Sequence, residues 1–257
     1  MIEILPELQS RLTELYWHGF AVFLRVAALS SLLPAFGERT VPMRIKLVIA
    51  LMFTMIVAPA VPMISQPADL VVLGLLVLSE TIVGLALGIA IRLFVLALQT
   101  AGSIAAQATS LAQILGGAAV EPIPAIGYVL VIAGLALAVM SGLHVQAAEY
   151  LIYSYEIFPV GEFPTASILA EWGISRISHA FSLAFALAAP FVIISLIYNL
   201  TLGVINRAMP QLMVAFVGAP VITFGGLFLL FVCSPMLLQI WADSIASFFA
   251  NPMEIAR

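Results

Sequence analysis

The stretch ISHAFSLAFALAAPFVIISLIYNLTLGVIN occupies residues 177–206, and Arg207 separates it from a second apolar stretch at residues 208–242. The two stretches hold 30 and 35 residues, whereas about 20 apolar residues suffice for a helix to cross the hydrocarbon core of a bilayer. Apart from Arg207, no lysine, arginine, aspartate or glutamate occurs in residues 177–242. No soluble domain needs so much uninterrupted apolar surface, so the sequence predicts an integral membrane protein.

The composition favours the same class. Of the 257 residues, 63% are hydrophobic and 9% are charged, whereas soluble domains average about 25% charged residues. The length fits one compact bundle of helices over residues 1–257. The net charge of −4 suggests no nucleic-acid partner, and the single cysteine, Cys233, excludes a disulfide framework. The N-terminus has no basic region followed by an apolar core, so we expect no cleaved signal peptide.

The predicted fold class is all-α, an integral membrane bundle of helical hairpins with about six long apolar helices. Residues 101–125, between the third and fourth of these, are uncharged except for Glu121 and are rich in small and helix-breaking residues. Such backbone would leave polar groups unsatisfied in lipid, so we expect an irregular segment that is buried in protein or lines an aqueous cavity. An acidic connection is expected at residues 153–176. The six apolar segments cover residues 15–33, 45–64, 70–97, 126–152, 177–205 and 213–248.

The charges outside these segments alternate along the chain and predict an orientation. Lysine and arginine collect in cytoplasmic connections, which would place both termini on the periplasmic side. Arg176 is the one basic residue in the connections that are otherwise acidic. The basic residues on the predicted cytoplasmic side are Arg39, Arg44, Lys46, Arg92 and Arg207, and the acidic ones on the other side are Asp69, Glu156, Glu162 and Glu171.

Two charged residues lie near the middle of predicted spans, Arg25 in the first and Glu80 in the third. A charged side chain at the centre of a bilayer costs roughly 2.5–3.5 kcal/mol on insertion scales, so both should face protein or water. One interpretation is a proton or ion relay. The other is a buried ion pair, or a set of hydrogen bonds, that fixes packing.

Gly84 and Gly88 form a G-x-x-x-G pair four residues after Glu80. Small residues spaced by four allow another helix to approach closely. The pair predicts tight helix packing, although it does not indicate which helix is the neighbour.

Nothing in the sequence predicts chemistry. The three histidines, His18, His144 and His179, have no metal-ligand spacing, and no nucleophile-elbow, zinc-protease or nucleotide-loop motif occurs. We therefore expect no catalytic residue, no cofactor and no metal site.

Residues 198–211, YNLTLGVINRAMPQ, continued by LMVAFVGAP at 212–220, closely resemble the signature of one family. It is the export-gate family of type III secretion systems, which comprises the flagellar biosynthetic protein FliR and its relatives in virulence systems. The resemblance covers essentially the whole chain, and its R-x-x-P-Q block is the most specific part. Further matching blocks are PAFG at 34–37, VPMRIK at 41–46, ETIVGLALG at 80–88, QTAG at 99–102 and FPVG at 158–161, together with Arg25.

The resemblance implies a structural subunit of the flagellar export gate, through which unfolded flagellar proteins pass. In that family a single copy joins several copies of the flagellar P and Q gate proteins around a central pore. Further contacts with the B and A export proteins are implied. The assembly lies in the basal body at the bacterial inner membrane, so the apolar spans would pack on partner subunits as well as on lipid.

The resemblance also gives residues 101–125 a role as a plug that enters the pore and helps to close it. Deletion of residues 114–120 is then expected to leave the assembly intact but leaky. The implied plug residues are Gln107, Leu111, Ile114, Leu115, Gly116, Gly117, Ala118 and Ala119.

Arg207, Pro210 and Gln211 follow the fifth span and predict a turn between the two halves of a hairpin. The Arg207 charge would bind a carboxylate or helix C-terminus of a neighbouring subunit, or it would anchor the turn on the cytoplasmic side. Arg25, Glu80, Gly84 and Gly88 complete the set that we expect to serve subunit packing or to be polar groups inside the membrane.

Two alternatives stay open at this point. The equivalent subunit of a virulence secretion system would share the same features. A small-solute transporter would use Arg25, Glu80 and the glycine-rich segment as its binding site, but the two halves of the chain show no convincing repeat, which such transporters often have.

Overall fold

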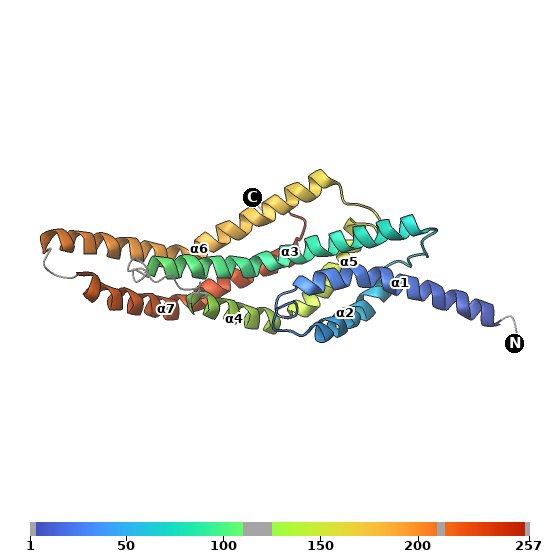
Figure 1. Cartoon of the computed structure of the whole chain (residues 1–257), viewed down its shortest axis with the longest axis horizontal. Coiled ribbons are helices and arrows are strands. Elements are labelled where there is room, and N and C mark those ends of the chain that lie inside the picture. The colour runs from blue at the N-terminus through green and yellow to red at the C-terminus, as the bar shows by residue number, and fades with distance from the viewer. Residues whose placement is uncertain (1–3, 110–124, 210–213, 255–257) are drawn as a thin grey trace. The chain divides into compact units, whose positions relative to one another are not determined.

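The computed structural model describes residues 4–109, 125–209 and 214–254, and these residues form helices joined by short connections (Figure 1). No strand occurs in the described ranges, which confirms the all-α prediction. Five helices are long and apolar enough to cross a membrane, or six crossings result if the broken pair α4 and α5 counts as one. The helices are α1 (Ile4–Leu32), α2 (Met43–Val57), the short 3₁₀ helix η1 (Ala58–Ala60), α3 (Leu70–Thr109), α4 (Ala125–Met140), α5 (Leu143–Ile157), α6 (Ala166–Ala208) and α7 (Val214–Ala250).

Several boundaries differ from those predicted. Residues 101–109, expected to be irregular, continue helix α3 to Thr109. Helix α6 begins at Ala166, so only residues 158–165 connect it to α5, in place of the expected acidic connection at 153–176. The fourth predicted span is two helices, because Gly142 has a positive φ of 81° and interrupts the helix there. The predicted boundaries were set at charges and glycines, which end an apolar stretch of sequence. The helices of the structure end elsewhere.

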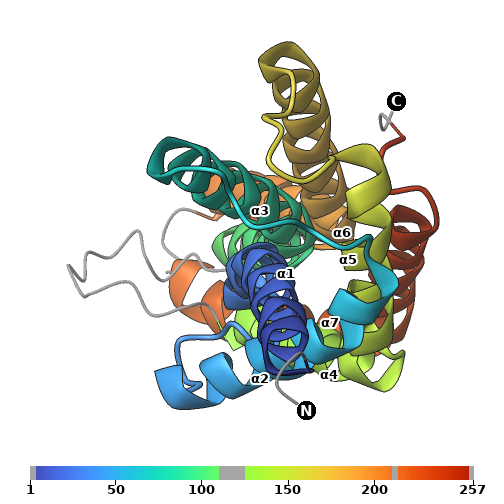
Figure 2. The same ribbon diagram turned by 90° about the vertical axis from the view of Figure 1, so that its right-hand side faces the viewer.

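The described chain divides into two compact units. The first comprises residues 1–92, 139–176 and 249–257, and in it α1 and α2 lie side by side (Figure 2). The buried side of α1 carries apolar residues at helical spacing, namely Val22, Val26 and Leu29, each at most 1% exposed. Trp172 of α6 donates a hydrogen bond from its indole nitrogen to the Pro252 carbonyl at 3.0 Å, which fixes the end of the chain within this unit.

The second unit comprises residues 93–138 and 177–248, and in it α6 and α7 run antiparallel (Figure 1). Trp241 of α7 is fully buried and donates from its indole nitrogen to the Phe94 carbonyl of α3 at 2.9 Å. The helices α3 and α4 cross in direct backbone contact, because a Cβ atom on Gly102 would overlap Gly127. A larger residue at this crossing would separate the two helices.

Candidate functional site

The candidate site is a buried cluster centred on Arg25 of α1, which is 0% exposed. Its Nε donates to Oε2 of Glu80 on α3 at 2.8 Å, and its Nη2 donates to Oε1 of the same carboxylate at 3.1 Å. This is the forked, bidentate geometry that gives arginine–carboxylate pairs their specificity. The structure thus brings together the two charges that the sequence placed inside separate spans.

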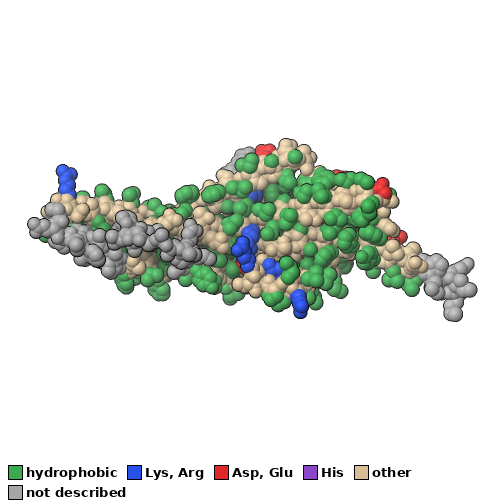
Figure 3. Space-filling model, viewed as in Figure 1, with side chains coloured by type: hydrophobic (Ala, Val, Ile, Leu, Met, Phe, Trp, Pro, Cys, Tyr) green, Lys and Arg blue, Asp and Glu red, His purple; other side chains and the backbone are tan. Residues whose placement is uncertain are grey.

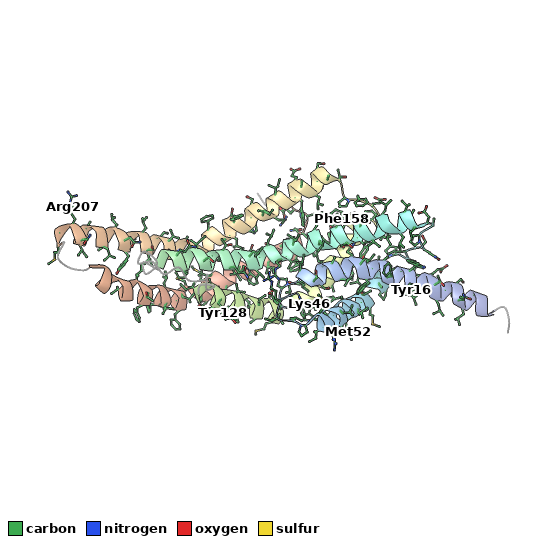
Figure 4. All side chains as sticks on the ribbon, in the orientation of Figure 1. Tyr16, Lys46, Met52, Tyr128, Phe158 and Arg207 are labelled. Atoms are coloured by element: carbon green, nitrogen blue, oxygen red, sulfur yellow. The ribbon has the colours of Figure 1, made fainter. Side chains whose placement is uncertain are left out.

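The remaining donors of Arg25 bind the end of helix α5. Nη1 donates to the Ser154 carbonyl and to the Ser154 hydroxyl, both at 3.1 Å, and Nη2 donates to the Phe158 carbonyl at 2.9 Å. Figure 4 marks Phe158, the residue that follows the last turn of α5. With the two bonds to Glu80, all five N–H groups of the guanidinium have an acceptor. The ring of Tyr155 packs against it with the guanidinium carbon 3.8 Å from the ring centre.

This partner set follows from how helices end. The last carbonyls of a helix have no partner within the helix, and the helix dipole makes that end favourable for a cation. Arg25 supplies both a donor and a positive charge there. On the other side of the cluster, the Gly161 N–H donates to Oε1 of Glu80 at 3.1 Å, which ties in the connection between α5 and α6. Gly161 has φ +76°, a conformation that favours glycine. We call Arg25, Glu80, Ser154, Phe158 and Gly161 the arginine clamp.

The clamp geometry favours the ion-pair interpretation over a proton relay. Both oxygens of Glu80 accept hydrogen bonds, and Glu80 is only 1% exposed. An arginine side chain does not give up its proton in proteins, so the partner of Glu80 cannot pass one on. The arrangement can hold three segments of the chain together. Besides Arg25, no titratable side chain among the described residues makes a hydrogen bond to Glu80.

Glu80, Gly84 and Gly88 lie on one face of α3, since residues four apart are neighbours on a helix. The same face packs on α1. A Cβ atom on Gly84 would overlap the Arg25 carbonyl and come within 2.7 Å of the Ala28 Cβ, and one on Gly88 would lie 3.0 Å from the Leu32 Cβ. The glycines therefore set the close spacing of α1 and α3 that lets Arg25 reach Glu80.

Replacing Gly84 with alanine is expected to destabilise the chain by about 1–3 kcal/mol, because the new methyl group meets backbone that cannot move without opening the clamp. Gly74 on the same helix is the matched control, since a Cβ atom there would meet nothing within 4 Å. Gly74→Ala should be neutral or slightly stabilising, because alanine is the better helix former. Thermal unfolding of the purified variants checks both, and equal melting temperatures would contradict the close packing.

Two further predicted site residues, Gln107 and Arg207, lie in the described part of the chain. Gln107 is exposed in the last turn of α3, and Arg207 is exposed in the last turn of α6 (Figure 4). The remaining residues of the predicted plug and turn lie outside the described residues, namely Leu111, Ile114, Leu115, Gly116, Gly117, Ala118, Ala119, Pro210 and Gln211.

Sequence reasoning missed the clamp residues Ser154 and Phe158, and it missed Tyr155, whose ring packs on Arg25. Two of the acceptors are backbone carbonyls, which leave no signature in the sequence. A signal did exist for Gly161, since the resemblance included the FPVG block at 158–161. Its glycine is the residue whose N–H binds Glu80.

Fold and site together define an all-helical integral membrane protein in which the clamp charges hold its own helices together. The sequence matches the family model of bacterial export proteins, family 1, over residues 16–248. It is 33% identical to the flagellar biosynthetic protein FliR of Caulobacter vibrioides over 226 residues, which cover 86% of this chain and 90% of that protein. The FliR proteins of Escherichia coli and Bacillus subtilis are 30% and 27% identical, and the matches cover 85% of this chain and 84% and 86% of those proteins.

The chain therefore belongs to this family of bacterial export proteins, and the resemblance to FliR inferred from the sequence is confirmed. It is a membrane protein of the flagellar export apparatus.

Proposed function

We propose that the chain is a structural, pore-forming subunit of the flagellar type III protein export gate. It assembles with the flagellar P and Q gate proteins, contacts the B and A export proteins, and passes unfolded flagellar polypeptides without chemistry of its own. The observation that carries this proposal is the match to the family model of bacterial export proteins, family 1, over residues 16–248.

The exposed surface supports an assembly role. In the apolar windows of the five long helices, only 22–39% of residues are buried inside the chain. Large side chains such as Phe224, Phe231 and Leu200 are 70–80% exposed, and Figure 3 shows hydrophobic side chains over much of the face in view. A monomeric soluble protein rarely exposes such patches. This surface needs lipid, partner subunits or both.

The clamp counts against a small-solute transporter. Arg25 and Glu80 were the charged groups on which such a site would depend, and they satisfy each other and nearby backbone. A solute would have to displace these bonds in a buried cluster. Because the relatives reported above are flagellar proteins, we propose the flagellar system in preference to a virulence system.

Co-expression with the P and Q proteins tests the assembly. The chain is expected to accumulate poorly alone and to purify with them in one large complex in which subunit numbers are unequal. Subunit composition by native mass spectrometry is the measurement. A stable monomer or symmetric homo-oligomer that forms regardless of the P and Q proteins would contradict the proposal.

The plug is part of the same proposal and rests on the family resemblance. Deleting residues 114–120 is expected to leave the complex assembled but to raise its ion conductance in a planar bilayer. Wild-type complex, purified in parallel, is the control. Unchanged conductance in an intact deleted complex would remove the plug assignment while leaving the gate assignment in place.

Location and orientation complete the proposal. The gate lies in the basal body at the bacterial inner membrane, and both termini of this chain face the periplasm. The charge distribution supports this orientation, because Arg39, Arg44 and Lys46 would then lie on the cytoplasmic side. Labelling of single cysteines introduced near either terminus by a membrane-impermeant reagent would test it.

A further inference from the structure

Helix α2 exposes an apolar surface around most of its circumference. Only Ala50, Phe53, Thr54 and Val57 are buried, at the spacing of one helix face. Elsewhere Met43, Met52 and Met55 are 79%, 60% and 75% exposed, and no charged residue occurs from Leu47 to Ala68. A narrow stripe would suit a single partner helix, whereas this wide surface suits an environment that surrounds the helix.

The chain that enters α2 forms a corner with uncompensated positive charge. The Val41 N–H donates to the Glu38 carbonyl at 3.0 Å, and Lys46 Nζ donates to the Gly37 carbonyl at 2.8 Å, so residues 37–46 fold back on themselves. The one carboxylate here, Glu38, is engaged by Arg92 at 3.0 and 3.4 Å. We call Arg39, Arg44, Lys46 and Arg92, with Glu38, the basic corner.

Two arginines of the basic corner are available to a ligand. Arg39 and Arg44 are exposed, and neither has a hydrogen bond or an ion pair with any residue that the structure describes. With four cations and one carboxylate, the corner carries a net charge of +3. Figure 4 marks Lys46 near the start of α2 and Met52 further along it, so the charge lies at one end of the apolar helix. Figure 3 shows basic side chains grouped on the face in view, bordered by hydrophobic ones.

We propose that α2 and the basic corner bind anionic phospholipid, with acyl chains along α2 and the phosphate headgroup at Arg39 and Arg44. The helical segment Met43–Ala60 has 18 residues and is roughly 27 Å long. Its residues from Leu47 on carry no charge and would lie in the hydrocarbon core, which is roughly 30 Å thick. Its basic end then lies at the headgroup level, where arginine and lysine stems extend towards phosphates. The basic residues lie only at one end of the helix. Carboxylates of a protein partner would more often pair with basic residues that are spread along it. The inference does not depend on the gate function.

The test uses the purified complex with the full chain, reconstituted in nanodiscs made from equal parts of phosphatidylglycerol and phosphatidylcholine. After gentle extraction in detergent, the ratio of the two lipids retained by the protein is measured by mass spectrometry. The variant is Arg39→Gln with Arg44→Gln. The matched control is Arg11→Gln, which removes one exposed arginine elsewhere, and it is compared with Arg39→Gln and Arg44→Gln made singly. A third variant, Arg39→Lys with Arg44→Lys, keeps the charge.

Wild type, control and lysine variant are expected to retain phosphatidylglycerol preferentially. The glutamine variant is expected to lose that preference by roughly five-fold for each arginine, the effect of one basic residue near an anionic surface. The wild-type preference should weaken as salt is raised. Arg39 and Arg44 are exposed and have no hydrogen bond or ion pair with a described residue, so the variant should fold, and its melting temperature checks this.

Three results would overturn the inference. One is a wild-type lipid ratio equal to that of the nanodisc. Another is an equal loss of preference in the control, which would show that the lipid preference depends on the net charge of the protein and not on the basic corner. The third is an unchanged lipid ratio with loss of a partner subunit from the glutamine variant, which would assign the corner to a protein carboxylate.

Discussion

Replacing Arg25 with alanine is expected to lower the stability of the folded chain by about 3–5 kcal/mol, the largest effect of any single charge removal in this protein. The loss arises because Glu80, at 1% exposure, keeps its charge, and no other cation in the described part of the chain pairs with it. The carbonyls of Ser154 and Phe158 lose a donor as well. The measurements are the amount of chain in the membrane fraction and the melting temperature of the purified complex.

Arg92→Ala is the matched control, because Arg92 also pairs with a glutamate, Glu38, but both side chains are 25% exposed. Pairs that water can reach contribute about 1 kcal/mol or less. Arg25→Lys should fall between the two, since lysine offers three donors to a site that uses five. If Arg25→Ala and Arg92→Ala proved equally mild, the clamp would not stabilise the fold.

Glu80→Gln separates the clamp from a proton relay. Glutamine keeps the size of the side chain but cannot carry a proton, and it leaves the Arg25 charge unneutralised. The clamp predicts less folded protein with normal export for each assembled complex. A relay predicts normal amounts of complex that export nothing. Secretion of a flagellar substrate, divided by the amount of assembled complex, decides between them.

Replacing Trp241 with alanine is expected to destabilise the second compact unit by about 3–5 kcal/mol, the usual cost of removing a large aromatic side chain from a core. Trp241 is 0% exposed and lies 3.7 Å from where a Cβ atom on Gly134 would be. Its indole also donates to the Phe94 carbonyl. Trp241→Phe keeps most of the volume and loses that one bond, so its cost should be nearer 1 kcal/mol.

Phe231 on the same helix provides the contrast, because it is 80% exposed. Phe231→Ala should leave the melting temperature of the purified complex unchanged. Should Phe231 face a partner subunit, the variant would instead purify with less of the P and Q proteins. Loss of chain stability equal to that of Trp241→Ala would show that the exposed surface of α7 is not as described.

The sequence predicted the class and the helices because a long apolar stretch in a bilayer has to satisfy its backbone hydrogen bonds internally, and a helix does so. It did not predict where the helices end. Residues 101–109 were predicted to begin an irregular segment because they are small. In the structure helix α3 continues through them, and Gly102 allows α4 to approach closely at Gly127. Glu171 and Arg176 read as a connection, although both lie in α6. A charged side chain is costly in contact with lipid, but it does not end an α-helix.

The sequence indicated two of the clamp residues but not that they form a clamp. Arg25 and Glu80 stood out because charge in an apolar span is costly, but 54 intervening residues separate them, and nothing in their spacing shows that they meet. The other partners contribute mainly backbone atoms, whose positions depend on where α5 ends. Such contacts become apparent only from coordinates.

The length of two helices has a consequence for where the protein resides. Helices α3 and α6 hold 40 and 43 residues, about twice the roughly 20 that cross a bilayer. If each helix crosses the bilayer once, part of its apolar surface lies outside the hydrocarbon core. On the proposed function, partner subunits would cover that part. Cells that make this chain without its companions should accordingly degrade it or deposit it as insoluble material.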